Sequence, residues 1–441
     1  MTLKTTVIAL SFAATLALTG CGSSSDDKTP ATSFVQVKDL PAAEKAAKIK
    51  AALTAYADYA LTSYTKAKAD AVLLQTALTT FTATPTAANL TAAKDAWLAS
   101  RESYGVTEIL RLSCGPIDGT GECAEAPNAQ HAAFLDAFGA PEGQLNAWPL
   151  DENMIDYTTD DTGAVTAGNI IDTAGNFTPT GGTQVDATTI NKELIAALNE
   201  NGGDANVATG YHAIEFLLWG QDQDYVSQTA DNITHGATVA GQRPLTDYTT
   251  DANADRRKAY LNAAAELIID DLDSMITAWT PGAGSYTEAL VGEGSNALAQ
   301  EDALKNIFSG MANFLGVELA NERIEVARAA ESEEDEHSCF SDNTHRDIDL
   351  NYIGFKDVLG DIFKDNLSTG LKTTIETKIT SIDAKVKTIN DVAKSTAHFD
   401  YQIVEANSPA NYANITATVT EMKALASDMT DVAAEYGIAL N

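Results

Sequence analysis

The stretch GYHAIEFLLWGQD, residues 210–222, has the composition of a buried helix, yet it contains a histidine and a glutamate three positions apart. Side chains at positions i and i+3 project from the same side of a helix, so His212 and Glu215 should lie together. An unpaired carboxylate in an apolar setting costs roughly several kcal/mol. We therefore expect Glu215 to meet an arginine, a hydrogen-bond network or a metal ion.

Helical periodicity extends outward from this stretch over most of the chain. Apolar residues recur three and four positions apart from Ala42 towards Phe81, and again from Arg256 to Trp279. A further helix is predicted after Pro85, with Thr86 as its cap and Trp97 on its inward side. Residues 158–188 lack this period and are rich in Thr, Gly and Asp, which predicts a long surface excursion.

Alternation typical of strands is scarce, so the sequence predicts an all-α fold of two packed helical bundles of the four-helix type. We expect an N-terminal bundle at residues 38–205. A C-terminal bundle at residues 206–441 would contain the 210–222 stretch.

The first 37 residues have the pattern of an exported protein. Residues 1–20 read as a signal peptide with one basic residue, an apolar run and a cleavage box that ends at Cys21. This pattern resembles bacterial lipoproteins, in which Cys21 would carry the lipid and residues 21–37 would form a flexible tether. An ordinary cleaved signal or a short membrane helix is the alternative. The lipid would anchor the protein in the cell envelope, with the outer membrane as the favoured location on its periplasmic or surface face.

The charge of the chain excludes one class of partner. The formal net charge is -34, from 28 basic and 62 acidic residues. Such a chain is a poor partner for nucleic acid, because both carry negative charge. Solubility outside the cytoplasm explains most of this charge.

Two of the four cysteines are close in sequence and flank a turn-rich segment. In an oxidising compartment, Cys114 and Cys123 are expected to form a disulfide that closes this loop. Cys339 would remain unpaired. The sequence has no CxxCH, so covalent c-type haem is not indicated.

Further ligands for a metal at His212 and Glu215 can be sought on the helix of residues 92–112. Glu108 is the candidate, and Arg101 and Tyr104 lie on the same stripe, where Arg101 would orient or neutralise Glu108. Histidine with carboxylates on facing helices is how bundles hold iron and similar cations. The alternative for Glu108 is a structural salt bridge to Arg101 or Arg111.

A second, weaker metal site is predicted in the polar segment 331–347, at His337, Asp342 and His345. Imidazole and carboxylate ligands together suit a first-row divalent metal. The alternative is a solvated acidic run. No HExxH, GxSxG, P-loop or GxGxxG motif occurs in the chain, so the sequence favours a binding site over a catalytic one.

The stretch at 210–222 resembles the GxHxxE motif of imelysin-like proteins, also known as the insulin-cleaving metallopeptidase family. Gly210, His212 and Glu215 take the three fixed positions, and Glu108 takes the glutamate of a Y-G-x-x-E block. Further blocks resemble the iron-regulated protein A branch and together cover nearly all of the chain after residue 21: RESYGVTEIL, CGPID, LNAWPLDENMIDY, RRKAYLNAAAELIIDDL, FLGVELANERIEVA and EDEHSCFSDNTHRD.

The resemblance implies two packed helical bundles with the GxHxxE helix near their interface, and an envelope protein linked to iron uptake. We therefore expect the protein to bind iron, or zinc as the second choice, as a bare ion or a chelate, through His212, Glu215 and Glu108, and to pass it to an iron-transport component. Tyr104, Arg101 and Gly210 would surround the ligands.

Two other functions remain open from the sequence. A zinc-dependent metallopeptidase of the imelysin type would use the same residues to activate water, although a catalytic zinc normally takes three ligands from protein. A surface interaction protein would use the His-Glu pair only for structure.

Overall fold

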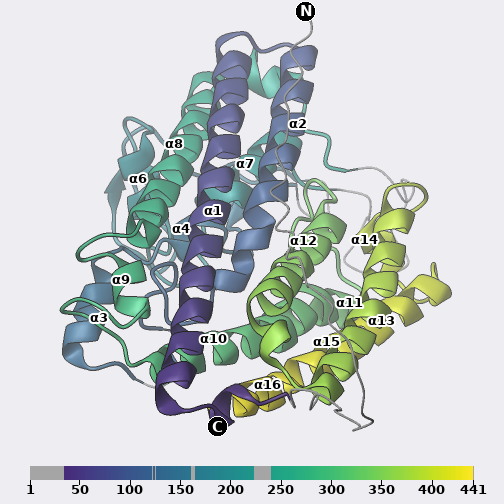
Figure 1. The fold of residues 1–441 in the computed structure, drawn as a ribbon. Coiled ribbons are helices and arrows are strands. Elements are labelled where there is room, and N and C mark those ends of the chain that lie inside the picture. The colour runs from purple at the N-terminus through teal and green to yellow at the C-terminus, as the bar shows by residue number, and fades with distance from the viewer. Residues whose placement is uncertain (1–33, 122, 125, 160–163, 223–239, 441) are drawn as a thin grey trace, which may run out of the picture. The chain divides into compact units, whose positions relative to one another are not determined.

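The computed structural model describes residues 34–121, 123–124, 126–159, 164–222 and 240–440, and these residues are mostly helical (Figure 1). In the described part of the chain, strand structure is limited to one short antiparallel pair, β1 (Asn176–Phe177) and β2 (Val185–Asp186), with Asn176 opposite Asp186. The predicted all-α fold is confirmed.

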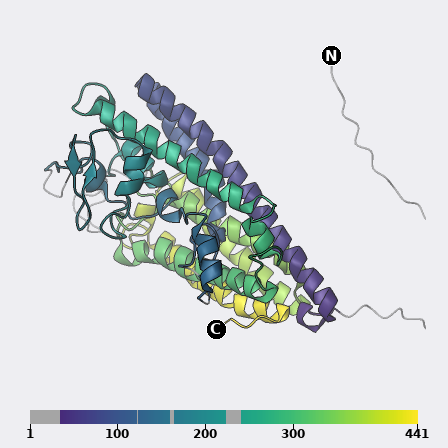
Figure 2. The same cartoon turned by 90° about the vertical axis from the view of Figure 1, so that its left-hand side faces the viewer.

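One group of helices surrounds the 42-residue helix α1 (Ala42–Ala83). Helix α2 (Ala87–Tyr104) returns along it, and α8 (Ala254–Trp279) packs on another side; α1 and α8 lie side by side in both views (Figure 1, Figure 2). Thr86 caps α2 by accepting a hydrogen bond from the Asn89 N–H at 3.2 Å, as predicted. Helices α6 (Lys192–Leu198) and α7 (Gly210–Trp219) pack on α8 and complete this group.

A second group contains the later helices. Helix α10 (Gln300–Asn313) continues through a π-helix, η5 (Phe314–Glu325), into α11 (Val326–Ala330). Helices α12 (Thr344–Asp357) and α15 (Pro409–Ser427) pack beside this rod, and α13 (Thr369–Ala393) packs on both of them. The remaining helical elements are short connections or end segments: η1 (Val37–Asp39), α3 (Ala129–Asp136), α4 (Glu142–Leu145), α5 (Glu152–Ile155), η4 (Leu245–Tyr248), α9 (Tyr286–Leu290), η6 (Val358–Phe363), η7 (Lys364–Asn366), α14 (Phe399–Gln402) and α16 (Met429–Tyr436).

The two groups meet where the 3-10 helix η2 (Gly105–Leu110) contacts α12. A side chain at Gly105 would begin 2.8 Å from Cβ of Leu350, and one at Gly354 would begin 2.5 Å from the carbonyl oxygen of Val106. Real Cβ atoms essentially never come that close, so both glycines are needed for this approach of the backbones. The close approach brings the end of α2 against α12, where the polar centre described below is found.

The excursion predicted at residues 158–188 is more firmly held than a surface loop. Ile170 and Ile171 are fully buried. The guanidinium of Arg256 donates hydrogen bonds to the carbonyl oxygens of Ile170, Ile171, Thr173 and Ala187 at 2.7–2.9 Å. One arginine of α8 therefore fixes the described part of this segment to the helical body.

Candidate metal centre

Helix α7 is buried along its whole length, and its first residue explains why the motif begins with glycine. Gly210 has a φ of 78°, a conformation that residues with a Cβ rarely adopt. A Cβ at this position would also lie 2.3 Å from the carbonyl oxygen of Leu145. Trp97 and Tyr260 then anchor the entry of the helix by donating to the carbonyl oxygens of Tyr211 at 2.9 Å and Ala208 at 2.6 Å.

His212 and Glu215 are in direct contact inside the protein, with exposed fractions of 1% and 0%. Nδ1 of His212 lies 2.9 Å from Oε2 of Glu215. The other carboxylate oxygen of Glu215 accepts hydrogen bonds from the backbone N–H and the hydroxyl of Ser341, at 3.0 and 2.6 Å. Burial raises the pKa of Glu215 to about 8 and, with Arg101 nearby, lowers the pKa of His212 to about 3.

A second histidine, His337, lies against His212. The two rings are nearly perpendicular, at 84°, with their centres 4.7 Å apart. His337 repeats the arrangement of the first pair, because its Nδ1 lies 2.9 Å from Oδ2 of Asp347. Burial and Arg323 lower the pKa of His337 to about 3. Both imidazoles are therefore neutral at neutral pH, and each has its Nδ1 against a buried carboxylate.

Asp347 is also the partner of Arg101. Nη2 of Arg101 donates to Oδ1 of Asp347 at 2.8 Å, and Nη1 donates to the side-chain oxygen of Asn146. The guanidinium lies 5.7 Å from the ring centre of Tyr104 and 5.3 Å from that of Tyr211, as a cation held between aromatic faces. Arg101 and Tyr104 thus border the centre as predicted from the stripe, but the hydrogen-bonded carboxylate of Arg101 is Asp347 and not Glu108.

Glu108 is held instead by Arg323, whose Nη2 donates to Oε2 at 2.6 Å, while Arg111 lies 3.5 Å from the same oxygen. Burial alone would raise the pKa of Glu108, but Arg323 and Arg111 outweigh it and the pKa is lowered. Arg323 also donates from Nε to Oε1 of Glu318 at 3.0 Å. These two residues are five positions apart in the π-helix η5, where the i to i+5 hydrogen bonding brings such positions onto neighbouring turns.

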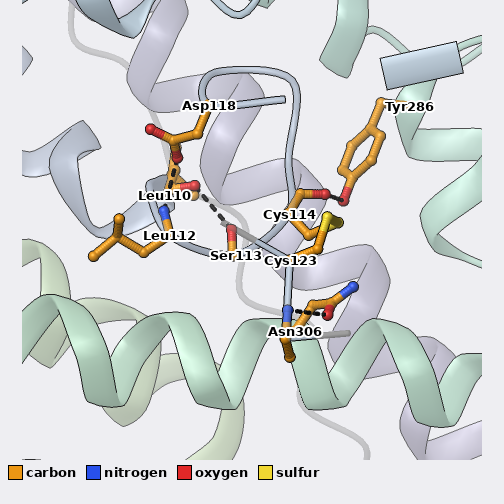
Figure 3. Close-up of a disulfide and its surroundings, with 9 residues drawn as sticks. Leu110, Leu112, Ser113, Cys114, Asp118, Cys123, Tyr286 and Asn306 are labelled. Carbon is orange, nitrogen blue, oxygen red and sulfur yellow. Dashed lines mark hydrogen bonds between the residues drawn. A yellow bond between two sulfur atoms is a disulfide. The ribbon is translucent and has the colours of Figure 1, made fainter. Parts of the chain in front are cut away.

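Arg111 connects this charge network to a disulfide-closed loop. Cys114 and Cys123 are joined by a disulfide (Figure 3). In the same loop, Asp118 accepts hydrogen bonds from the Leu112 N–H at 2.7 Å and from Nε of Arg111 at 3.3 Å. The disulfide loop therefore supplies a carboxylate that fixes the arginine beside Glu108.

The residues predicted for a second site separate in the structure. His337 belongs to the centre around His212. Asp342 lies instead with His398 and Asp400, and the ligand atoms of these three side chains are all within 4.8 Å of one another. His345 stays next to Asp342 through a contact of 3.0 Å from its Nδ1 to the Asp342 carbonyl oxygen.

Sequence reasoning missed four participants in the main centre: Asp347, Asn146, Arg323 and Ser341. Arg323 carried a signal, because it interrupts a stripe of glutamates on its helix. The other three lie in different segments, and their patterns contain nothing that points to His212.

The centre offers donors to a metal, although His212 and Glu215 contact each other and Glu108 is paired with Arg323. Nε2 of His212 and Oε1 of Glu108 are buried and have no hydrogen-bond partner. These are the atoms that an ion could use. Among the described residues, His212, Glu215 and Glu108 do not form a group as tight as that of Asp342, His398 and Asp400. Their action as one ligand set stays a prediction.

The predicted signal peptide and the lipid expected on Cys21 lie outside the described residues. Within the described ranges, no helix has the length and apolar character required to cross a membrane.

Comparison with known proteins identifies the family and the fold. A model of the family described as Imelysin matches residues 60–429. The chain belongs to the imelysin family. The crystal structure of a candidate iron-regulated protein A precursor from Parabacteroides distasonis shares the imelysin fold of this chain, with a TM-score of 0.59 and 15% sequence identity over 91% of this chain and 99% of that one. No curated protein sequence matches the chain.

Proposed function

We propose that this imelysin-family protein binds iron, or a related metal ion, as a cargo in iron acquisition, at the buried centre of His212 and His337. The observation that carries the proposal is the repeated histidine-carboxylate pair. In metal sites, a ligating histidine typically donates its second ring N–H to a carboxylate, which fixes the ring and raises its basicity. His212 with Glu215 and His337 with Asp347 have this arrangement.

The arrangement gives each residue a distinct task. When the proton of the first pair resides on Nδ1 of His212, Nε2 carries a free lone pair for the ion. His337 and the unpartnered oxygen of Glu108 would supply the other protein donors. A set of imidazole and carboxylate ligands suits iron, with zinc as the alternative. Glu215 is engaged by His212 and Ser341, so its task is to orient His212 rather than to bind the metal.

The cellular part of the proposal rests on the family and on the N-terminal sequence. The Parabacteroides distasonis protein is described as iron-regulated. The signal pattern before Cys21 supports export and a lipid anchor in the cell envelope, at the outer membrane. There the protein would take up the ion or a chelate and deliver it to a transport component.

The test is metal binding by the purified chain and three variants. His212→Ala should abolish uptake of Fe²⁺ and Zn²⁺ measured by titration calorimetry and elemental analysis. Glu215→Gln, which keeps the shape but weakens the hold on Nδ1, should lower affinity about 10–100-fold. His131→Ala is the matched control: His131 is 8% exposed and its Nε2 also lacks a partner, but it belongs to α3, where its ring contacts Phe134.

Equal metal uptake by wild type and His212→Ala would contradict the proposal. If, in addition, the variant unfolded at a lower temperature, the pair would be structural, as expected for a surface interaction protein. Chelator-sensitive cleavage of an unfolded protein substrate that is lost in Glu215→Ala would instead favour the metallopeptidase.

A further inference from the structure

A hollow in the surface lies directly beside the buried centre. Its volume is about 420 Å³, and the partly buried Ser341 belongs to its lining. The hydroxyl of the same Ser341 donates to Oε1 of Glu215 at 2.6 Å. Glu215 itself is 0% exposed. Along this line, one residue separates solvent in the hollow from the carboxylate that holds His212.

The hollow is also lined by side chains of two helices that contact each other, α2 and α12. Leu98 and Glu102 line it from α2, and His345 and Arg346 line it from α12. Nε and Nη2 of Arg346 donate to the two carboxylate oxygens of Glu102, at 2.8 and 2.7 Å. The side chain of Glu102 is 46% exposed and that of Arg346 is 17% exposed. This outer pair joins the two helices at the surface of the protein.

A second ion pair joins the same two helices in the interior. Nη2 of Arg101 donates to Oδ1 of Asp347 at 2.8 Å, and the two side chains are 0% and 1% exposed. Each residue of this inner pair is the immediate neighbour in the chain of a residue of the outer pair. Asp347 is also the carboxylate against Nδ1 of His337. The outer pair, the inner pair and His337 therefore follow one another from the surface to the centre.

The contact between the two helical groups is of a different kind beyond the end of α2. There Gly105 meets Leu350, and Gly354 meets the backbone of Val106, so closely that a Cβ on either glycine would collide with its neighbour. Such close packing leaves little room for movement. At the hollow, by contrast, polar pairs next to solvent join the helices. A separation of α2 from α12 would therefore begin at the hollow and pivot about the glycines.

The two pairs differ in how readily they open. An exposed ion pair contributes little to stability, because water screens both charges and can replace their hydrogen bonds. A buried pair is costly to break, because its charges are left without partners. When Glu102 moves away, Arg346 keeps its hydrogen bonds to Asp349 and, at 3.2 Å, to Oδ1 of Asn390. The outer pair can therefore open first, and water that enters behind it reduces the cost of opening the inner pair.

We propose that this hollow is the entrance to the His212 centre and that Glu102 closes it through its pair with Arg346. Opening at this point lets water, and with it a hydrated cation, reach Asp347 and His337. Glu102 is a positioning residue, because it holds α2 against α12 and does not touch the ion in the closed centre. That the entering ion is iron or a related metal rests on the proposed function, whereas the opening itself does not.

The first test uses the metal-free chain and the reactivity of its buried histidines. Diethyl pyrocarbonate acylates imidazole nitrogen atoms, and it reaches His212 and His337 when the centre opens. In Glu102→Gln, the modification rates of these two histidines should rise about two- to fivefold, the range expected for loss of an exposed ion pair. Peptide mass spectrometry measures each rate separately. His131 of α3, which is 8% exposed, is the internal control and should react at an unchanged rate.

A matched variant separates the entrance from a general loosening of α12. Asp383→Asn removes the partner of Lys356 in an ion pair between α12 and α13, and the side chain of Asp383 is 44% exposed, close to the value for Glu102. This variant should leave the modification rates of His212 and His337 as in wild type. An equal rise in Asp383→Asn and Glu102→Gln would overturn the proposal.

The second test follows Zn²⁺ and Fe²⁺ by stopped flow, with dissociation into an excess of chelator. Glu102→Gln should raise the association and dissociation rates by the same two- to fivefold factor and leave Kd unchanged, because the outer pair is closed in both the free and the bound state. A changed Kd with unchanged rates would overturn the proposal, and so would modification rates of His212 and His337 equal to those of wild type. If wild type took up no metal, the proposed function would fail, and the histidine modification would still decide the entrance.

Discussion

The carboxylates of the His212 centre and those on the connection between α11 and α12 have different neighbours. At the His212 centre, Glu108 and Glu318 are contacted by Arg323, and their pKa values are lowered, that of Glu318 to about 2. On the connection, burial raises the pKa values of Glu333 and Glu336, and the charges of nearby carboxylates such as Asp222 and Asp400 raise them further. All four side chains are largely or fully buried, so burial alone does not decide the charge state.

The difference comes from the charges that lie next to each carboxylate. Where arginines from neighbouring helices supply the positive charge, the carboxylates are stable as anions without a ligand. Around Glu333 and Glu336, the influences that raise the pKa are burial and the charges of other carboxylates, and both favour the protonated form. The charge state of a buried carboxylate in this fold is therefore set by its charged neighbours.

The largest effect is expected from removing Arg323, the arginine that pairs with Glu108 and Glu318. Arg323→Met would leave Glu108 and Glu318 buried without their main partner and should cost about 3–5 kcal/mol of unfolding free energy, measured by urea unfolding. Arg323→Lys keeps the charge and should cost less. Lys387→Ala, on an exposed i,i+4 pair with Asp391, is the control and should be unchanged. If Arg323→Met lowered the unfolding free energy by less than about 1 kcal/mol, the buried carboxylates would not need Arg323 for stability.

Low pH should weaken the ion pair between Glu318 and Arg323. The pKa of Glu318 is about 2 in the folded protein against an ordinary value of 4.5, because Arg323 and Arg111 outweigh the effect of burial. Its stabilising effect is present above pH 4.5 and is lost as the pH falls towards 2. Glu318→Gln should therefore be less stable than wild type by about 2–3 kcal/mol at pH 7, and the two should converge near pH 2. A gap that stays constant with pH would contradict this explanation.

A buried carboxylate of α8, whose pKa is raised and not lowered, should show the opposite pH dependence. Asp271 of α8 has a pKa raised to about 7 by burial and by Asp270, and its Oδ2 has no partner. The folded state binds this proton more tightly, so stability falls as the pH rises from about 4 to 7. Asp271→Asn should match wild type near pH 4 and be more stable by about 1–2 kcal/mol at pH 8. Equal pH profiles for the two proteins would refute the assignment.

Much of the fold could be predicted because it depends on local periodicity. The cap at Thr86, the buried Trp97 and the helix that ends at Trp279 follow from the spacing of apolar residues and from capping preferences. The contact of His212 with Glu215 follows from helix geometry in the same way.

The rest of the centre could not be predicted from spacing, because its partners come from distant segments. Asp347 lies 246 positions from Arg101, and Ser341 lies 126 positions from Glu215. The sequence groups His337 with Asp342 because they are close in the chain, but in the structure His337 contacts His212 and Asp342 lies with His398 and Asp400. Charge pairing also has several equivalent solutions in a chain with many acidic residues, and only packing selects Arg323 for Glu108.

The π-helix η5 makes the pairing of Arg323 with Glu108 depend on the number of residues in the helix as well as on their identity. An α-helix turns by about 100° per residue, so removing one residue between Gly316 and Asn321 and restoring α-helical geometry would rotate Arg323 away from Glu108. Relatives that lack a residue there would need another cation beside Glu108. A gap at this place in an alignment should therefore coincide with a change of charge elsewhere in the centre.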